Sequence, residues 1–523
     1  MVERATDVLV VGCGIAGAAA ALRLADDPSR RVTVITRERP PTESATFYAQ
    51  GGIVYRGPGD SVDRLVEDVL AAGAGIASPE AARAVAERGP SLIDELLVGR
   101  LSIPFDRCED GSLSLAREGG HSLARILHVQ DATGRAIEQA LVDALLQAPN
   151  VQIQTRWTAV DLITSPHHNR DQLTVYRRPQ CHGCYVLDRE TGDVRRVLAP
   201  ATILATGGLG QIFRHTSNPE GARGDGLAMA YRAGARIVNA EYVQFHPTTL
   251  AIPGASDFLV SEAVRGAGAR LLTPTGDRFM GRHAPEWMEL APRDVVARAM
   301  HQEMVKGGFS HLLLNIASSL GAEEIERAFP TIVAACREAG VDPTVEPIPV
   351  VPAAHYHCGG VLCDLRGRTS LAGLYAVGEV SCTGLHGANR LASMSLLEGL
   401  VWGTAAAEDI AARNDLPDPP EDDLRPWSSA TESEADPVLI LRDMETVRNI
   451  MWHYVGLARS TSRLRRAVDD LDHLWKGIDD FYRRTKLSDD LIGLRNMVQC
   501  AWIIARAAMR NPESRGTHWR SEA

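Results

Sequence analysis

The sequence has no stretch that marks a membrane-spanning or secreted protein. No run is both apolar and long enough to span a bilayer, and the opening residues MVERATDVLVV lack a basic segment followed by a cleavable apolar stretch. The nine cysteines are scattered and odd in number, so reduced thiols in a cytoplasm are their simplest interpretation. We therefore expect a cytoplasmic protein that makes no contact with a membrane.

Excess positive charge and clustered cysteines are also missing. A formal net charge of -11 offers no general basic surface, which argues against nucleic-acid binding. Cys181 and Cys184 have CxxC spacing, but they lie in a polar segment that we expect to be a loop, with no second pair or histidine pair nearby. Neither a haem-binding C-x-x-C-H motif nor a cysteine cluster for iron–sulfur ligation is present. We therefore expect no metal site.

The N-terminal segment predicts a dinucleotide-binding unit. An apolar, β-branched strand over residues 7–11 precedes a GxGxxG motif at residues 12–17, an alanine-rich helix and a second strand over residues 31–36. The glycines permit a tight turn and let backbone N–H groups approach a pyrophosphate at the helix N-terminus. Thr36 and Arg37 stand where a ribose-binding acid is usual, which weakens the case for a nicotinamide cofactor.

Residues 355–399 predict a place where a cofactor and an anionic ligand meet. An apolar strand ends at Gly378 and Glu379, and a carboxylate at a strand end commonly bonds a cofactor hydroxyl. Arg390 precedes a predicted helix, where its guanidinium and the positive helix end would together favour a carboxylate. The alternative for this stretch alone is a buried strand, loop and helix with surface charges.

Changes in sequence pattern divide the chain into several predicted units, because 523 residues are too many for one simple core. The stretch after residue 240 mixes strands and helices as an insertion does, whereas Leu441, Met444 and Val447 begin a series at helical spacing. The predicted units are a cofactor-binding domain (1–239 and 353–413), a capping domain (240–352), a linker rich in Pro, Asp, Glu and Ser (414–437), an antiparallel helical bundle (438–510) and a polar, frayed tail (511–523).

Several motifs together resemble one family. The blocks ATFYAQGG (45–52), HGANR (386–390) and APRDVVARAM (291–300) are similar to those of the succinate dehydrogenase and fumarate reductase flavoprotein group. The REGGHS loop (117–122), the Phe-Tyr pair before AQGG and the GLH run (384–386) resemble its L-aspartate oxidase branch. The resemblance covers nearly the whole chain. It implies an α/β fold class, in which a Rossmann-like FAD-binding domain carries an inserted α+β capping domain and a C-terminal helical bundle.

The resemblance implies FAD that is bound noncovalently. Ala45 stands where membrane-bound relatives carry the histidine that bonds to the flavin, and an alanine cannot form that bond. The glycine motif would face the pyrophosphate, Arg37 the adenosine, and the loop from Thr46 to Gly52 the isoalloxazine ring. Asp225 and Glu379 would bind the hydroxyl-bearing chain. The implied cofactor-binding residues are Gly12, Gly14, Ile15, Ala16, Gly17, Arg37, Thr46, Phe47, Tyr48, Ala49, Gln50, Gly51, Gly52, Asp225, Glu379, Ser395 and Leu396.

The resemblance also implies that the substrate is L-aspartate. Its two carboxylates need cationic or strong donor partners, and its ammonium needs an acceptor. Residues at the positions where the family binds the two carboxylates supply the cationic and donor partners, with Ser261 in place of the usual threonine. Glu118 is the only carboxylate that a motif places as the acceptor for the ammonium. It would repel a dicarboxylate that lacks the ammonium. The implied substrate-binding residues are Gln244, His246, Ser261, His355 and Arg390.

The implied reaction is hydride transfer from the substrate Cα to flavin N5. The product would be 2-iminosuccinate, and the electrons would pass to O₂, giving H₂O₂, or to fumarate. The implied catalytic residues are Arg293, which matches the group's catalytic arginine, and Glu118. In this family the reaction opens de novo NAD biosynthesis by the quinolinate route. Because imines are unstable in water, transient contact with quinolinate synthase is a further expectation.

Two other functions compete with this interpretation. The first is a soluble fumarate reductase or succinate dehydrogenase-type flavoprotein, against which stand Ala45, the REGGHS loop and the missing haem and iron–sulfur motifs. The second is a noncatalytic role in which the C-terminal bundle docks on a partner enzyme. An assay with L-aspartate and with succinate separates them.

Overall fold

A computed structural model describes residues 6–252, 258–413, 416, 418–428 and 433–522 of the chain. A five-stranded parallel sheet forms the centre of its first domain, in the order β17-β10-β1-β2-β6. The central strands are apolar except for Thr33 and Thr202, because other layers cover both of their faces. The strands are β1 (Val8–Val11), β2 (Val32–Ile35), β6 (Val151–Gln154), β10 (Ala201–Leu204) and β17 (Leu374–Ala376).

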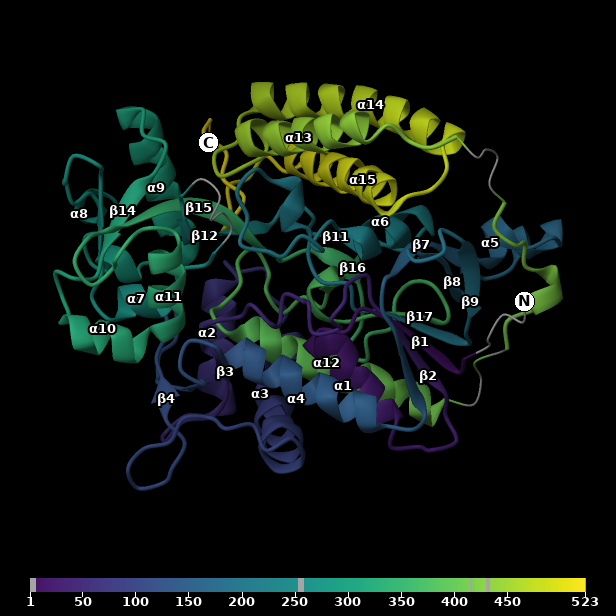
Figure 1. Ribbon diagram of the computed structural model, residues 1–523, viewed down its shortest axis with the longest axis horizontal. Coiled ribbons are helices and arrows are strands. Elements are labelled where there is room, and N and C mark those ends of the chain that lie inside the picture. Colours follow the sequence, from purple (N-terminus) through teal and green to yellow (C-terminus); the bar gives the residue numbers. More distant parts are fainter. Residues whose placement is uncertain (1–5, 253–257, 414–415, 417, 429–432, 523) are drawn as a thin grey trace.

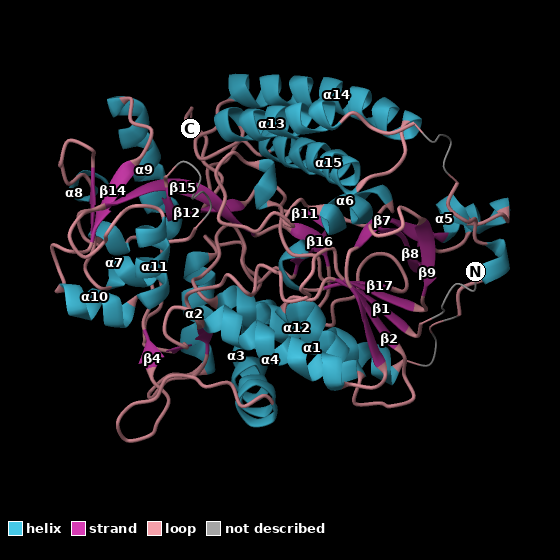
Figure 2. Ribbon diagram, viewed as in Figure 1, coloured by secondary structure: helices cyan, strands magenta, loops and turns pink. Residues whose placement is uncertain are grey.

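A layer of helices covers one face of this sheet (Figures 1 and 2). Small residues let α1 and α12 approach closely, since a Cβ on Gly403 would lie 2.3 Å from the carbonyl oxygen of Ala16. Ser78 caps the start of α3, because its Oγ accepts a hydrogen bond from the N–H of Ala81 and Pro79 takes the first helical position. The helices are α1 (Ile15–Leu24), α2 (Val62–Ala72), α3 (Pro79–Leu92), α4 (Thr133–Gln147) and α12 (Met394–Ala412).

The predicted dinucleotide-binding opening is confirmed as strand, glycine turn, helix and strand. Gly12 has a φ of 110°, and a Cβ there would lie 2.1 Å from the carbonyl oxygen of Ala205. A Cβ on Gly17 would lie 2.1 Å from the carbonyl oxygen of Gly12. Only glycine fits either position, so the motif is required by the packing of the turn itself.

The segment around Cys181 is a buried strand, and the prediction of a loop there was wrong. Cys181 and Cys184 lie in β8 (Cys181–Asp188), the middle strand of a sheet with β7 (Trp157–Thr164) and β9 (Val194–Leu198). The polar His182 is buried with a partner, Ser165 Oγ, 2.7 Å from its Nε2. Both thiols are free, and the described residues contain no group of three side chains able to hold a metal ion.

The inserted region forms a separate α+β unit on the left of Figure 1. Its antiparallel sheet has the order β12-β15-β14-β13, and its own apolar core includes Phe279, Met300 and Leu314. The strands are β12 (Val243–Leu250), β13 (Arg270–Leu272), β14 (Leu312–Asn315) and β15 (Ile348–His357). The helices are α7 (Glu262–Gly266), α8 (Met280–His283), α9 (Arg293–Gly307), α10 (Ala322–Ala328) and α11 (Pro330–Glu338).

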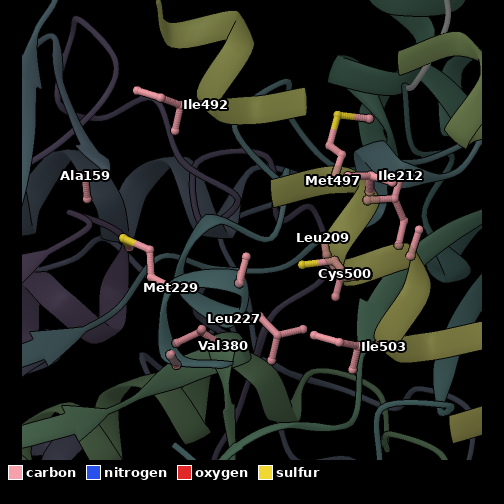
Figure 3. Packing of buried hydrophobic residues seen from close by; sticks show 14 of the residues in the cluster. Ala159, Leu209, Ile212, Leu227, Met229, Val380, Ile492, Met497, Cys500 and Ile503 are labelled. Carbon is pink, nitrogen blue, oxygen red and sulfur yellow. The ribbon is translucent and has the colours of Figure 1, made fainter. Parts of the chain in front are cut away.

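Three long helices form the predicted C-terminal bundle: α13 (Pro437–Tyr454), α14 (Thr461–Arg484) and α15 (Asp489–Arg510). Helix α15 packs on α6 (Asp225–Arg232), and Figure 3 shows Met497, Cys500 and Ile503 near Leu209, Ile212 and Leu227. The remaining elements are β3 (Ile53–Val54), β4 (Leu115–Ala116), β5 (Ile126–Leu127), α5 (Ser165–His168), β11 (Ile237–Val238), β16 (Gly360–Leu362) and β18 (Ser381–Cys382). Within the described ranges, no helix combines the length and hydrophobicity that a bilayer span requires.

The segments on either side of the bundle pack onto the protein. Parts of the predicted linker, 414–415, 417 and 429–432, lie outside the described residues, but Leu424 is 1% exposed and Tyr185 Oη donates to the carbonyl oxygen of Arg425. The expectation of a frayed tail was wrong for residues 511–522. His518 is buried with its Nδ1 2.6 Å from Arg459 Nη1 because the tail's polar groups find buried partners.

Candidate active site

One cavity runs from the glycine turn after β1 to the inserted region. Its walls include residues from the cofactor-binding domain and from the inserted region. Gly12 and Ile15 line one end, and His246, Arg293 and Arg390 line the other. The cavity therefore joins a glycine turn suited to a dinucleotide with cationic side chains suited to a small anion.

The cavity brings together most of the residues predicted from sequence. Its walls contain both predicted catalytic residues and all predicted cofactor- and substrate-binding residues except Gly17, Phe47 and Gln244. Gly17 packs beneath the glycine turn, and the Phe47 ring lies 5.0 Å from the Arg135 guanidinium carbon. Gln244 lies behind the wall, where its Nε2 donates to the backbone oxygen of Arg390 at 2.8 Å. The individual roles of these residues stay predictions.

The end of the cavity at the glycine turn suits a pyrophosphate and a chain of hydroxyls. The N-terminus of α1 faces it, and Thr46 Oγ1 accepts from the N–H of Ile15 at 3.0 Å, which holds the 44–52 loop against the helix start. Glu379 accepts from the N–H of His357 at 2.9 Å, and burial raises its pKa to about 7. Two buried cavity-wall atoms, Thr206 Oγ1 and Gln50 Oε1, have no hydrogen-bond partner among the residues that the structure describes. These free polar groups fit the hydroxyl-rich chain of FAD.

Helix α15 supports the end of the cavity beside Arg37, where the adenosine of FAD is predicted to bind (the adenosine end). Arg37 Nη1 donates to Asp489 Oδ2 at 2.9 Å, and Arg223 donates to both carboxylate oxygens of Asp489 at 3.2 Å. Burial alone would raise the pKa of Asp489, but the arginines hold it far below its usual value. Asp225 lines the wall, yet its two oxygens already accept from Arg223 Nη2 and Asn496 Nδ2. Charges at this end are therefore matched by the protein.

Arg390 is a buried cation without an acidic partner. It is 4% exposed, and none of the described carboxylates forms a salt bridge with it. Its Nη2 donates to His355 Nε2 at 3.0 Å and its Nη1 to Ser395 Oγ at 3.2 Å, while the guanidinium lies 4.8 Å above the ring of Tyr356. Burial and the charge of Arg293 lower the pKa of Arg390 to about 10. An anion in the cavity would relieve this unbalanced charge.

His246 and His355 have different hydrogen-bonding states. Burial and nearby arginines hold the pKa of both well below the usual range, so both rings are neutral. His246 Nδ1 accepts from the N–H of Thr248 at 3.2 Å, which leaves the proton on Nε2, a buried atom with no partner in the described part of the chain. His355 Nε2 accepts from Arg390, so its Nδ1 carries the proton toward Ser217 Oγ at 2.7 Å. His246 therefore offers a free donor, whereas His355 orients Arg390.

Arg293 heads a buried chain of charges that sequence reasoning missed. As the first residue of α9, it donates from Nε to Glu262 Oε2 at 2.6 Å, and Arg265 Nη2 lies 3.6 Å from the same oxygen. Burial would raise the pKa of Glu262, but the two arginines lower it to about 2. The sequence signal was a Glu and an Arg three residues apart, which is common on surface helices and did not identify the site.

Glu118 lies opposite this chain, where its carboxylate faces the cavity. Ser393 Oγ donates to Glu118 Oε2 at 2.6 Å. Burial and repulsion by Glu262 raise the pKa of Glu118, although Arg293 and Arg390 oppose the shift. Ser393 was not among the predicted site residues because no motif pairs it with residue 118.

Comparison with known proteins identifies the family. Residues 7–396 match the FAD binding domain family, and residues 444–523 match the fumarate reductase flavoprotein C-terminal family. L-aspartate oxidase 1 of Ralstonia nicotianae is 46% identical over 98% of this chain and 94% of its own length. L-aspartate oxidase of Yersinia pestis is 45% identical over 99% of this chain and 96% of its own length. The chain belongs to the L-aspartate oxidase family.

Membership of the L-aspartate oxidase family confirms the resemblance, the enzyme class and FAD as the cofactor. The fold is shared more widely. A chain of E. coli quinol fumarate reductase aligns with a TM-score of 0.89 and 29% identity over 99% of this chain and 92% of that chain. The predicted fold class is confirmed by these comparisons. Fold alone therefore does not separate the L-aspartate oxidase family from fumarate reductases, and the separation has to come from the site.

Proposed function

We propose that this enzyme oxidises L-aspartate to 2-iminosuccinate and passes the electrons to O₂, giving H₂O₂, or to fumarate. Bound FAD supplies the chemistry by accepting hydride from the substrate Cα and giving up electrons to the acceptor. The observation that carries the proposal is one cavity beside the dinucleotide turn that is lined by Glu118, by the free donor His246 Nε2 and by Arg390, which has no acidic partner among the described residues. L-aspartate has two anionic groups and one cationic group that match this arrangement.

The substrate carboxylates would be bound by groups that lack protein partners. Arg390 has no acidic partner among the described residues, and His246 Nε2 is a buried donor without an acceptor. Charge-assisted hydrogen bonds to a carboxylate satisfy both groups at once. Ser261 Oγ, at the start of α7, is a further donor on the same wall. The binding of a dianion therefore removes an electrostatic imbalance that is built into the apoprotein.

Glu118 would bind the α-ammonium of the substrate. Glu262 already repels the charged form of Glu118. The ammonium of a substrate would stabilise the Glu118 carboxylate, whereas a dianion without an amine would be repelled by it. Because the pKa of Glu118 is raised, its carboxylate can also take a proton from the ammonium, which leaves the neutral amine needed to form an imine. Glu118 thus favours aspartate over succinate.

Arg293 would hold a substrate carboxylate and connect the cavity to the buried chain through Glu262 and Arg265. An arginine is hard to deprotonate, so its main role is electrostatic. The ionised Glu262 fixes the guanidinium by accepting from its Nε. Both roles require Arg293 at the start of α9, where the chain from the inserted region meets the cavity.

The cofactor would be noncovalent, because Ala45 on the cavity wall has no nucleophilic side chain. We place the enzyme in the cytoplasm, where its free, mostly buried thiols would stay reduced. The product belongs to the quinolinate route of NAD biosynthesis. Transient contact with quinolinate synthase is supported by the instability of the imine in water.

A second candidate is a fumarate reductase or succinate dehydrogenase-type activity, which the TM-score of 0.89 with E. coli quinol fumarate reductase favours. The purified yellow protein separates the candidates in a steady-state assay that measures H₂O₂ release, or fumarate consumption without oxygen, after L-aspartate is added. Succinate with a dye acceptor is the control. The proposal requires turnover with L-aspartate and little with succinate, and the opposite result would establish the second candidate.

A further inference from the structure

We propose that Ser393 is the positioning residue that aims Glu118 at the substrate ammonium and so helps to set the preference for an amino dicarboxylate. This inference rests on the proposed function. Ser393 directly precedes α12, and two residues separate it from the HGANR run. Its Oγ donates to Glu118 Oε2 at 2.6 Å and accepts from the N–H of Gly52 at 3.3 Å. One hydroxyl therefore joins the carboxylate to the loop beside the predicted flavin ring.

The left-handed backbone conformation of Ser393 indicates a functional role for its hydroxyl. Its φ of 54° and ψ of 12° lie in the left-handed region, where a residue with a Cβ is disfavoured and glycine is preferred. Seven non-glycine residues within the described ranges have positive φ, and of these only Ser393 lines the cavity. Strained residues cluster at functional sites. A glycine would relieve the strain at Ser393 but would release Glu118.

Glu118 needs this restraint because competing charges surround it. The loop that carries Glu118 continues into Gly119 and Gly120, which fix the backbone weakly. Arg293 of α9 and Arg390 attract its carboxylate, and Glu262 of α7 repels it. No salt bridge joins Glu118 to either arginine in the described part of the chain. By holding Oε2, Ser393 keeps Glu118 from neutralising the arginines that the substrate carboxylates need.

The position of Glu118 agrees with this role. A Cβ added to Gly51 would lie 2.8 Å from Glu118 Oε1 and 3.3 Å from Ser393 Oγ. The carboxylate and the hydroxyl thus lie directly over the loop that is predicted to run along the isoalloxazine ring. A substrate whose Cα faces that ring would present its amine on the same side.

The test uses two variants that remove the same hydroxyl but differ in backbone strain. Ser393→Ala keeps the strain, and Ser393→Gly relieves it. We expect both to raise the KM for L-aspartate by roughly tenfold, the lower end for losing a hydrogen bond to a charged group, with a smaller change in KM for fumarate. The melting temperature should be higher for Ser393→Gly than for Ser393→Ala. If Ser393→Gly instead has the KM for L-aspartate of the unmodified enzyme and only the less stable Ser393→Ala has a raised KM, the hydroxyl has no positioning role and the inference is overturned.

Ser102 provides a matched control. Its φ is 51°, it is exposed, and it lies outside the cavity. Ser102→Gly relieves the same type of strain and should leave both KM values unchanged. A tenfold rise in the KM of this control would show that the kinetic effect comes from backbone strain in general and would contradict the inference.

A double variant separates failure of this inference from failure of the proposed function. If Ser393 acts through Glu118, then Ser393→Gly adds no further loss of aspartate oxidation in a Glu118→Gln background. Full additivity would overturn the inference while leaving the proposed function intact. Absence of L-aspartate turnover in the unmodified enzyme would instead overturn the proposed function.

The pH profile adds a readout that a purely structural role would not move. The Ser393 hydroxyl donates to the charged form of Glu118, so its removal raises the pKa of that carboxyl. The acidic limb of kcat/KM for L-aspartate should therefore move to higher pH in Ser393→Ala and Ser393→Gly. Glu262, Arg293 and Arg390, which also act on Glu118, are unchanged in these variants. An unmoved limb would contradict the positioning role.

Discussion

The two ends of the cavity are built on opposite electrostatic principles. At the adenosine end, Arg37 and Arg223 are bonded to Asp489, so the protein neutralises its own charges. At the other end, Arg390 has no acidic partner within the described residues, and His246 keeps a buried donor free. A buried charge without a partner is unfavourable for the apoprotein, which means that the unbalanced end is the one arranged for a charged ligand.

This difference predicts that variants at the substrate end change turnover, whereas variants at the adenosine end change stability. The largest effect should come from Arg293→Leu. Loss of one preorganised electrostatic group typically lowers kcat by about a hundred- to a thousandfold, and Arg293 also binds substrate. Turnover with L-aspartate should be abolished, while the flavin absorbance of the purified protein stays normal. Near-normal activity would remove Arg293 from the mechanism.

At the adenosine end, Asp489→Asn should lower the free energy of unfolding by about 3 kcal/mol, the lower end of the cost of breaking a buried ion pair, because the buried Arg223 loses Asp489 and keeps only Asp225 as a charge partner. FAD should also be released more readily, since Arg37 loses its anchor. Thermal melting and the FAD content after dialysis measure both effects. Asp490→Asn is the matched control, because Asp490 is exposed and adjacent in sequence. Equal melting temperatures for the two variants would show that Asp489 does not support this end.

Glu118→Gln sharpens the comparison within the substrate end. The amide keeps the shape and the acceptor for Ser393 but loses the charge that faces the ammonium. Aspartate oxidation should fall by roughly ten- to a hundredfold, as expected for a charge-assisted hydrogen bond, and fumarate reduction should fall much less. Equal losses in both reactions would mean that Glu118 does not contact the ammonium.

The smallest effect is a dependence of dicarboxylate affinity on high pH. Because the pKa of Arg390 is lowered to about 10, the free enzyme loses this positive charge as the pH rises above that value. Binding of a dianion needs the charged form, so the dissociation constant for fumarate should be flat below pH 10 and rise about tenfold per unit above it. Titrations of flavin absorbance measure it, with circular dichroism as a check on folding. A constant affinity through this range would exclude Arg390 as the cation that binds the carboxylate.

The sequence predicts the cofactor end better than the substrate end, because the first depends on local backbone geometry. Gly12 directly follows β1 and Gly17 lies in the first turn of α1, so spacing alone identifies them. Ser393 contacts Glu118 across 275 residues, and Glu262 contacts Arg293 across 31 residues of the inserted region. No local pattern encodes such pairs, although a family resemblance found Glu118 and Arg293.

The two wrong predictions have a related cause. The segment at Cys181 looked like a loop because His182 is polar, yet its ring is satisfied inside the protein by Ser165. The C-terminal tail looked frayed because it is polar, yet His518 and Arg459 bond to each other in the interior. A polar segment is exposed to solvent only when its polar groups have no hydrogen-bond partner inside the protein. Partners that are distant in the chain cannot be recognised from one sequence.

The central claim is that the unbalanced end of the cavity accepts an amino dicarboxylate, and flavin reduction without any electron acceptor tests it most directly. The wild-type holoenzyme is mixed anaerobically with L-aspartate or with succinate, and loss of the oxidised flavin absorbance is followed. We predict rapid and complete bleaching by L-aspartate and little by succinate. An enzyme that stays oxidised in L-aspartate, or that succinate bleaches equally fast, would contradict the account.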